Sequence, residues 1–552
     1  MPVQIVPESA PFSPEQRAWL NGFLAGVLGM LDEEQARGGS SAVMAAAASL
    51  LTPPSGDSSN SLRDSDTKDE DFPWHDSALP IVDRMQLADG RPIERQMMAA
   101  MAQLDCGTCG YLCQSYAEAI VSGAEKNLTL CSPGGGETAK MLRQLNKNRQ
   151  SIAKANGSET SSPSSEIKAN EKLGTRNSPV LAKLIRSVPL NKLGSAKDTR
   201  HVEIDLTDTG LEYRVGDALG LWPSNCDDLV TAVIDAAKLD PMSKVLASEP
   251  KTRLSDELKN RCLRSIPTEL VDRAIERVRE RPKHNGALAV DADLCERLAT
   301  FVDSDEFDAL DLLEFFARFP NLGLLASDLV EILPPIRPRL YSIASSQSHF
   351  SNQVHLTVGR VENEVRDRKR KGVASTMLAD RLQPNETLRV FVQPSHGFTI
   401  PADPNAPMIM VGPGTGIAPF MAFLQQRKVD NANGKNWLLF GDQRRAFDYL
   451  YENQLEAWHQ DGLLTRLDLA FSRDGVEKLY VQHRMKENGA ELFDWLEAGG
   501  YFFVCGDASR MAVDVERALI EIISQHGLRT PEQAKQYLAE LTKAKRYVRD
   551  VY

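Results

Sequence analysis

The chain has 552 residues, of which 42% are hydrophobic and 25% are charged, and its formal net charge is -12. These values are typical of globular proteins, and at about 150 residues per domain they predict three or four domains. The acidic balance argues against nucleic acid as a general partner, and no apolar run approaches the 18 or so residues of a membrane span.

The N-terminus lacks the basic and apolar segments of a signal peptide, so we expect a cytoplasmic protein. In that compartment the eight cysteines are not expected to form disulfides.

Residues 1–35 are predicted to contain a helix. Ser13 suits an N-cap, Pro14 suits the first helical position, and apolar residues follow at helical spacing. We interpret this helix as a docking helix, with packing in a core as the alternative. Residues 36–71 are rich in Ala, Ser, Pro and Asp, which indicates a flexible linker.

Four cysteines, Cys106, Cys109, Cys113 and Cys131, are spaced C-x2-C-x3-C-x17-C. Four thiolates so placed can hold one zinc ion or one iron–sulfur cluster. Structural zinc sites usually pair two C-x2-C units, and this stretch has only one. The spacing therefore favours a four-iron cluster, with zinc as the alternative.

The same stretch resembles the four-iron cluster domains of Rnf-type electron-transport subunits and of corrinoid iron–sulfur proteins. The shared features are the Cys-Gly-x-Cys-Gly-Tyr opening at Cys106 and the Cys-x-Pro-Gly-Gly close at Cys131. One residue fewer precedes the third cysteine here. The resemblance implies a small helical 4Fe–4S domain over residues 72–145, with the four cysteines as ligands. A second flexible linker is expected over residues 146–178.

Strands are predicted from Pro179 onward. Residues 201–206 and 354–359 alternate in polarity, whereas residues 227–328 have a mostly helical pattern. In and just before this helical part, Cys226, Cys262 and Cys295 lack the spacing of ligands, so we expect them to be packing residues. The charged run at 366–371 predicts a solvated loop, with a docking patch for a partner as the alternative.

The stretch Arg337–Ser346 follows two prolines and then alternates like a half-buried strand. Alternation directs Arg339 and Tyr341 to one face and Leu340 and Ser342 to the other. Arginine suits a phosphate and tyrosine can stack on a flat ring. An ordinary edge strand is the alternative.

Residues 407–411 form a predicted buried strand, and Gly412–Pro419 turns it into a helix. This turn offers free N–H groups to an anion, although it is not the Gly-x-Gly-x-x-Gly pattern of dinucleotide-binding folds. Residues 501–504 form another predicted buried strand, which ends at Cys505.

From Pro179 to Tyr552 the chain resembles the ferredoxin–NADP reductase superfamily, and more narrowly the diflavin reductases and the NADPH–sulfite reductase flavoproteins. The resemblance implies an antiparallel FAD-binding β-barrel over residues 179–400, with a helical insertion at about 225–330, and a doubly wound NADPH-binding α/β domain over 401–552. It also implies FAD contacts at Arg339, Leu340, Tyr341, Ser342, Thr357, Val358, Gly359, Gly372, Val373, Ala374 and Ser375.

For NADPH the resemblance implies a pyrophosphate turn at Gly414 and Thr415, with Asp514 further along the nucleotide site. The resemblance also implies a clamp for the 2′-phosphate, formed by Ser472, Arg473, Lys478, Tyr480 and Gln482. Tyr552 is expected to cover the flavin face. Ser342, Cys505 and Asp550 are expected to surround the place of hydride transfer as the catalytic residues.

Together these features predict a multidomain enzyme that passes electrons from NADPH through FAD to a 4Fe–4S cluster, which takes the place of FMN; FMN is not expected. The resemblance implies the sirohaem subunit of an assimilatory sulfite reductase, which serves cysteine biosynthesis, as the first candidate partner. An NADPH–ferredoxin, nitrite, nitrate or haemoprotein reductase of the same build is the alternative. A further alternative is a non-catalytic assembly scaffold with a structural zinc site.

Overall fold

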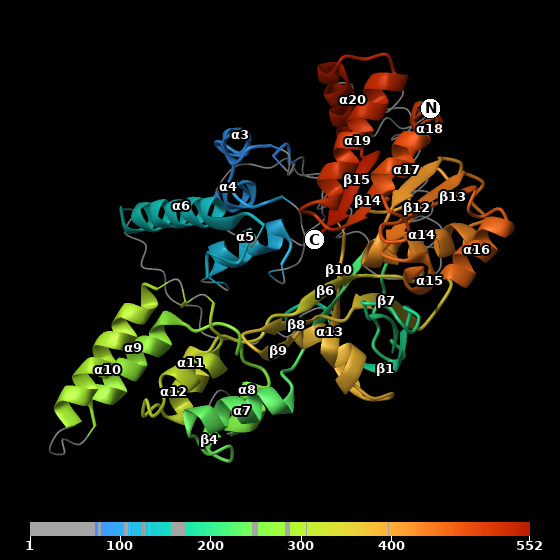
Figure 1. Cartoon of the computed structure of the whole chain (residues 1–552). Helices are drawn as coiled ribbons and strands as arrows, with labels where there is room; N and C mark the ends of the chain where they lie inside the picture. Colours follow the sequence, from blue (N-terminus) through green and yellow to red (C-terminus); the bar gives the residue numbers. More distant parts are fainter. Residues whose placement is uncertain are drawn as a thin grey trace, which may run out of the picture. The chain divides into compact units, whose positions relative to one another are not determined.

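The computed structural model describes residues 72–74, 79–103, 109, 111–123, 125, 127–131, 133–155, 173–245, 252–281, 287–304, 306–307, 309–395 and 397–552, with the side chains of 150–155 and 287–290 left aside (Figure 1). The predicted docking helix and the first linker therefore lie outside the described residues, as does Cys106.

A small helical domain begins at Phe72. It contains α3 (Ile81–Leu87), α4 (Ile93–Ala99), α5 (Cys113–Ser122) and α6 (Gly135–Ala155). Tyr116, Ile120 and Leu142 contribute to its core, and Trp74 is fully buried. Helix α6 continues ten residues into the segment predicted as a linker from residue 146.

The FAD-type barrel is a six-stranded antiparallel sheet. Its strands, in sheet order, are β6 (Arg339–Ser342), β3 (Ala218–Trp222), β10 (Thr387–Gln393), β1 (Val180–Pro189), β2 (Thr199–Asp205) and β7 (Gln353–Gly359). A bridge between Ile343 and Leu356 joins the two ends of this order, so the sheet closes on itself. Inward-facing residues such as Val202, Leu219 and Leu356 fill its core.

A set of helices with one two-stranded hairpin lies between β3 and β6 in the chain, where the helical insertion was predicted. It comprises α7 (Asp227–Ala237), β4 (Lys244–Val245), β5 (Thr252–Arg253), α8 (Leu254–Leu258), α9 (Thr268–Arg279), α10 (Ala287–Val302), α11 (Leu312–Arg318) and α12 (Ala326–Ile332). It has its own aromatic and aliphatic core, against which Cys295 packs. The buried carboxylate of Asp328 accepts hydrogen bonds from Arg273 and Arg277 at 2.8 Å each.

The prediction of a solvated loop at 366–371 is wrong for its second part. Strand β9 (Arg368–Lys371) pairs with β8 (Glu362–Val365) in a hairpin. Arg368 and Arg370 form ion pairs with Asp311 and Glu314 of the insertion. These ion pairs attach the hairpin to α11. Their acidic partners lie more than fifty residues away in the chain, so the basic run alone does not reveal them.

The C-terminal domain is a five-stranded parallel sheet with the order β13 (Arg466–Phe471), β12 (Asn436–Asp442), β11 (Met408–Val411), β14 (Tyr501–Gly506) and β15 (Tyr547–Val551). All four residues of β11 are buried, as expected for a parallel strand covered on both faces. One hydrophobic core lies on each face of the sheet, so the predicted doubly wound architecture is confirmed.

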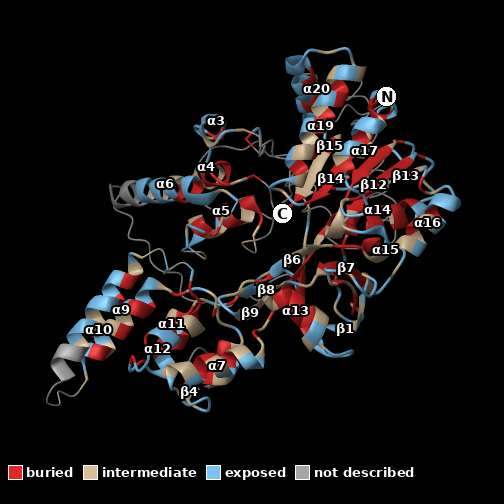
Figure 2. Cartoon of the chain, in the orientation of Figure 1, coloured by how far each residue is buried: buried red, intermediate tan, exposed pale blue. Residues whose placement is uncertain are grey.

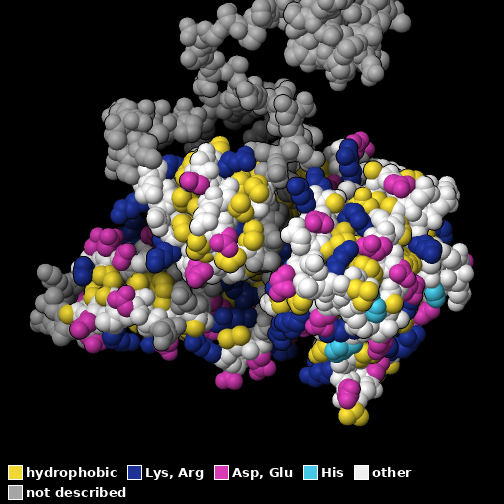
Figure 3. Space-filling model, turned by 90° about the horizontal axis from the view of Figure 1, so that it is seen from above, with side chains coloured by type: hydrophobic (Ala, Val, Ile, Leu, Met, Phe, Trp, Pro, Cys, Tyr) yellow, Lys and Arg dark blue, Asp and Glu magenta, His cyan; other side chains and the backbone are white. Residues whose placement is uncertain are grey.

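One face carries η2 (Gly414–Ile417), α14 (Ala418–Val429), α15 (Arg445–Asp448) and α16 (Glu452–Gln460), and the other carries α17 (Val481–Glu487), α18 (Gly489–Glu497), α19 (Met511–His526) and α20 (Pro531–Lys543). Figure 2 shows buried residues concentrated along β12, β14 and α14. Acidic and basic side chains are interspersed on the face seen in Figure 3. Within the described ranges, none of the helices combines the length and apolar character needed to cross a bilayer.

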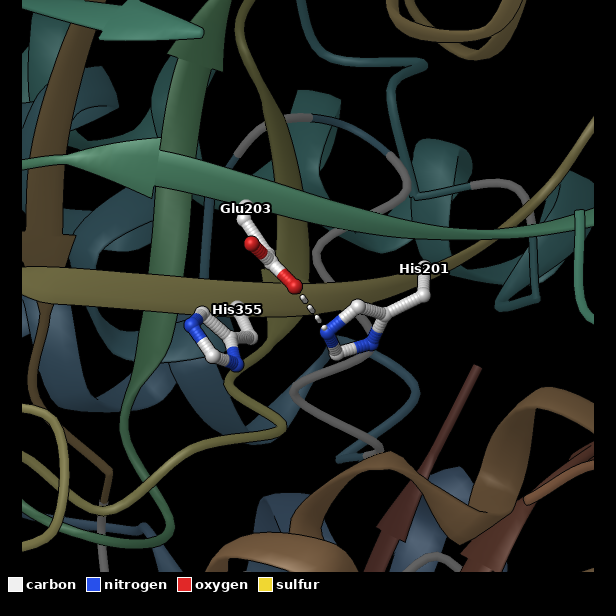
Figure 4. A group of neighbouring side chains, drawn as sticks. All are labelled: His201, Glu203 and His355. Carbon is white, nitrogen blue, oxygen red and sulfur yellow. Dashed lines mark ion pairs between the residues drawn. The ribbon is translucent and has the colours of Figure 1, made fainter. Parts of the chain in front are cut away.

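A polar cluster of three residues, His201, Glu203 and His355, is enclosed between β2, β7 and the C-terminal domain (Figure 4). Glu203 lies opposite His355 in the β2–β7 register, so both side chains occupy the same face of the ladder. Burial, followed by the neighbouring imidazole of His201, lowers the pKa of His355 to about 4. His355 is therefore neutral in the folded protein at neutral pH.

A histidine of the unfolded chain titrates near pH 6.5, so the unfolded state binds a proton that folded His355 excludes between about pH 6.5 and 4. The stabilisation from neutral His355 is therefore present above pH 6.5 and is lost as the pH falls toward 4. We expect a loss of about 2 kcal/mol between pH 7 and 5, and His355→Gln should remove this part of the pH slope. Thermal unfolding of both forms in metal-free buffer at these pH values tests this, and parallel slopes would contradict it.

Candidate active site

The site lies where the carboxyl ends of the parallel strands meet strand β6 of the barrel. Segment Gly412–Ile417 leaves β11 and passes directly over the end of β14. A Cβ atom on Gly416 would stand 2.1 Å from the carbonyl oxygen of Cys505, so only glycine permits this approach. Ligands of open α/β sheets bind at this edge, which makes it the expected nucleotide site.

The structure brings together the three residues predicted to be catalytic. The hydroxyl of Ser342, at the end of β6, donates to Asp550 Oδ2 at 2.6 Å. The Cys505 Sγ lies 3.8 Å from the same oxygen. Cys505 and Asp550 are direct neighbours in the β14–β15 register, so the parallel sheet sets their separation.

The thiol of Cys505 is fully buried. Burial, and next the carboxylate of Asp550, raise its pKa well above the ordinary value. Cys505 is therefore a neutral thiol at physiological pH, unlike the thiolate of a nucleophilic cysteine.

The C-terminal residue Tyr552 is fixed at the same edge. Its backbone N–H donates to Gly506 O at 3.0 Å, and its carbonyl oxygen accepts from Ala508 N at 3.1 Å. Its hydroxyl lies 3.0 Å from the hydroxyl of Thr415 in the predicted pyrophosphate turn. The residue as a whole is 42% exposed. Tyr552 thus connects the end of the chain to the turn after β11.

Strand β6 carries the predicted Arg-Leu-Tyr-Ser contacts to FAD. Arg339 is exposed, and Tyr341 packs partly against the barrel core. Thr357, Val358 and Gly359 end strand β7. The hydroxyl of Thr357 is 2.7 Å from that of Tyr451, so its side chain contacts the C-terminal domain.

The predicted phosphate cap is helix α13 (Val373–Thr376) with Gly372 as its N-cap. The backbone N–H of Val361 donates to Ser375 Oγ at 3.1 Å, and that of Thr376 donates to Gly372 O at 3.0 Å. Ala374 and Ser375 are buried, which places this short helical turn firmly against the barrel.

The residues predicted to clamp the 2′-phosphate follow β13. Arg473, Lys478 and Tyr480 are all exposed, and the backbone N–H of Ser472 donates to Asp442 O at 2.9 Å. Gln482 Nε2 lies 3.4 Å from Asp514 Oδ2, which links two predicted residues of the nucleotide site.

The prediction from sequence missed an ion pair at this edge, between Lys197 of the barrel and Asp442 of β12. The Asp442 side chain is fully buried, and its Oδ2 has no hydrogen-bond partner within the described part of the chain. Burial raises the pKa of Asp442, and Lys197 counteracts this. Asp442 could have been found, because it follows the apolar run Trp437–Phe440, which is typical of a buried parallel strand with a ligand site at its carboxyl end. Lys197 lies in no recognisable motif.

In the helical domain, the three described cysteines of the motif converge. Cys109, Cys113 and Cys131 line one small hollow together with Tyr111, Tyr116 and Pro133. A Cβ atom on Gly134 would stand 3.0 Å from Cys131 Sγ, so this glycine lets the backbone pass close to the sulfur. Three thiols from separate segments around an otherwise apolar hollow form a donor set that suits a metal centre.

Two contacts join the helical domain to the barrel segments. The guanidinium of Arg176 lies over the ring of Tyr111, 3.5 Å from its centroid, and 6.0 Å from the ring of Trp222 on β3. Arg337, two residues before β6, pairs with Glu125 at 3.6 Å. Tyr111 therefore lines the cysteine hollow and also contacts Arg176, which lies near Trp222 of the barrel.

Comparison with known families agrees with this architecture. Residues 174–377 match the FAD binding domain family, and residues 410–517 match the oxidoreductase NAD-binding domain family. The chain therefore carries an FAD-binding domain and an oxidoreductase NAD-binding domain, and the predicted antiparallel barrel and parallel sheet are confirmed.

Among curated proteins, the chain is similar to sulfite reductase (NADPH) flavoprotein alpha-components. It is 43% identical over 378 residues to that of Photorhabdus laumondii and 40% identical over 401 residues to that of Bacillus subtilis (strain 168). These alignments cover 68% and 72% of this chain, respectively. The chain spans 61% and 65% of the length of these two relatives.

The ion pair of Lys197 with Asp442 should stabilise the fold. Lys197→Met leaves a buried carboxylate without its cation, and we expect it to lower the free energy of unfolding by about 1–2 kcal/mol, since the lysine is itself partly exposed. Asp442→Asn in the same chain should restore part of this loss. A double-mutant cycle on the unfolding free energies measures the coupling, and additivity within about 0.3 kcal/mol would contradict the assignment.

Proposed function

We propose that this protein is an NADPH-dependent reductase that uses FAD and a 4Fe–4S cluster to deliver electrons to a sulfite reductase haem subunit. The observation that carries the proposal is the contact of Ser342 with Asp550, beside Cys505. This contact joins strand β6 of the barrel to the carboxyl edge of the parallel sheet, where a nicotinamide and a flavin ring would meet.

The barrel residues fit FAD. Arg339 would pair with a phosphate of the pyrophosphate, and the N–H groups at the start of α13 would cap it. Tyr341 would hold the flavin ring on strand β6, and Thr357, Val358 and Gly359 would contact FAD through their backbone. When bound, FAD would accept a hydride from NADPH and release the electrons singly.

The C-terminal domain fits NADPH. Gly414 and Thr415 would bind the pyrophosphate through the turn after β11. Arg473 and Lys478 supply exposed cations for the 2′-phosphate, which favours NADPH over NADH on electrostatic grounds. Lys197, at the mouth of the same turn, would add a further positive charge near the pyrophosphate.

The three residues proposed as catalytic would orient the nicotinamide ring and stabilise the charge that develops on it. Asp550 holds the Ser342 hydroxyl in one orientation and would stabilise positive charge on the nicotinamide ring. The neutral, buried thiol of Cys505 would pack against the nicotinamide without adding charge. Tyr552 would cover the flavin face, so its ring would have to move for nicotinamide to approach during turnover.

The helical domain fits an iron–sulfur cluster. Cys109, Cys113 and Cys131 would hold it together with Cys106, which lies outside the described residues. When bound, such a cluster would carry one electron at a time. The Arg176 and Arg337 contacts would keep this domain beside the barrel, and Tyr111 would lie between the cysteine hollow and Trp222.

The partner follows from the relatives, whose names describe a flavoprotein alpha-component of sulfite reductase. By this analogy the acceptor is the sirohaem-containing subunit, and the pathway is assimilatory sulfite reduction for cysteine biosynthesis in the cytoplasm.

We expect Tyr552→Ala to slow steady-state turnover of NADPH about tenfold, equivalent to about 1.4 kcal/mol, because nicotinamide then stays bound and product release becomes limiting. Tyr552→Phe is the matched control, since it keeps the ring and loses only the hydroxyl contact with Thr415. Steady-state rates with a soluble electron acceptor measure both, and equal rates for Tyr552→Ala and the native chain would contradict the role of the ring.

We expect Cys109→Ser to abolish electron delivery to the haem subunit while NADPH still reduces the flavin, since the thiol lies in the helical domain. Cys262→Ser, outside the cysteine hollow, is the control and should behave like the native chain. Anaerobic stopped-flow absorbance separates the two steps. If flavin reduction disappears together with delivery, the proposed order of carriers is wrong.

A further inference from the structure

The polar cluster of His201, Glu203 and His355 contains the set of side chains that transition metals prefer. One nitrogen of each imidazole and one carboxylate oxygen all lie within 4.8 Å of one another (Figure 4). His355 and Glu203 are only 4% and 7% exposed. Their positions are fixed by the β2–β7 register, in which Glu203 faces His355 and His201 faces Thr357.

The hydrogen bonds around the cluster orient its imidazoles as a metal site requires. His201 Nδ1 lies 2.9 Å from the hydroxyl of Tyr451, which continues to Thr357 Oγ1 at 2.7 Å. Without a metal, His201 Nε2–H donates to Glu203 Oε1, 3.3 Å away. A metal ion at Nε2 would move this proton to Nδ1, which could then donate to Tyr451. His355 Nε2 is 3.0 Å from Gln353 Oε1, so its Nδ1 is the atom left for a ligand role.

The charge state also suits a metal. Burial is the main cause that lowers the pKa of both His201 and His355. Two neutral imidazoles keep the lone pairs that a cation binds, and the carboxylate of Glu203 supplies the negative charge.

Arg186 on β1 competes for this carboxylate. Its Nε and a terminal nitrogen donate to the two oxygens of Glu203 at 2.8 and 2.6 Å. The Arg186 side chain is 60% exposed, whereas that of Glu203 is 9% exposed. The guanidinium can therefore turn into solvent without breaking the core, and the carboxylate would then be available.

We propose that His201, Glu203 and His355 bind one divalent ion of the zinc class, and that Arg186 occupies the carboxylate when the ion is absent. Imidazole nitrogens select zinc, cobalt or nickel over magnesium and calcium, which prefer oxygen ligands. Bond lengths of about 2.0–2.2 Å require the ligand atoms to approach one another to about 3.4 Å, which small side-chain rotations provide. The ion would cross-link β2 and β7 beneath Tyr451 of the C-terminal domain.

Zinc content of the full-length chain tests the proposal. The cysteine site is first filled by anaerobic iron–sulfur reconstitution, so that it does not take up zinc. After equilibrium dialysis against buffered zinc, elemental analysis should find one zinc per chain in the native form and none in His355→Gln. His349→Gln, an exposed histidine nearby in the chain, is the matched control and should keep the zinc.

The Arg186→Gln variant distinguishes a metal site from a cluster that has only a structural role. Because it removes the competing cation, it should bind zinc roughly tenfold to a hundredfold more tightly than the native chain. Equal zinc content in the native and His355→Gln chains, or an Arg186→Gln chain that binds zinc no more tightly, would overturn the proposal.

Discussion

The hydrogen bond from Ser342 to Asp550 is the interaction on which the site depends. It joins two residues 208 positions apart, one on strand β6 of the barrel and one on β15, the last strand of the parallel sheet. Neither domain alone contains all three proposed catalytic residues, because the barrel supplies the hydroxyl of Ser342 and the parallel sheet supplies the carboxylate of Asp550 and the thiol of Cys505. The register of β14 with β15 sets the spacing of Cys505 and Asp550, so the fold positions the chemistry through its backbone.

Other contacts hold the two domains in this relation. Lys197 reaches from the barrel to Asp442 at the end of β12, and Lys192 pairs with Glu452 at 2.5 Å. Asn191 donates to the buried carboxylate of Asp448 at 2.9 Å. Each pair joins the segment between β1 and β2 to residues between the end of β12 and the start of α16, and the partly buried pairs contribute more than exposed ones would. The polar cluster and Tyr451 lie at the same boundary.

Local patterns were sufficient for much of the fold. The apolar run at 407–411 predicted β11, because a strand buried on both faces has a continuous apolar sequence. The alternation at 201–206 predicted β2, although Glu203 on its polar face is buried as well. The hairpin at 368–371 was not predictable in this way, since four basic residues in a row carry no alternation. Its strand exists because Asp311 and Glu314 neutralise two of them from a distant helix.

The candidate site was predicted by motif resemblance and not by spacing. Ser342, Cys505 and Asp550 have no local signal that connects them, and the resemblance alone brought them together before the structure did. Lys197 with Asp442, and His201 with Tyr451, are separated by 245 and 250 positions and belong to no motif that we recognised. Such pairs arise from domain packing, which a single sequence does not reveal.

The central claim is that electrons leave the flavin through a cluster held by the cysteines of the helical domain. The most direct measurement is the cofactor content of the full chain, purified without oxygen and without reconstitution. The account predicts one FAD together with about four iron and four acid-labile sulfide per chain. Stoichiometric FAD without iron or sulfide would contradict it.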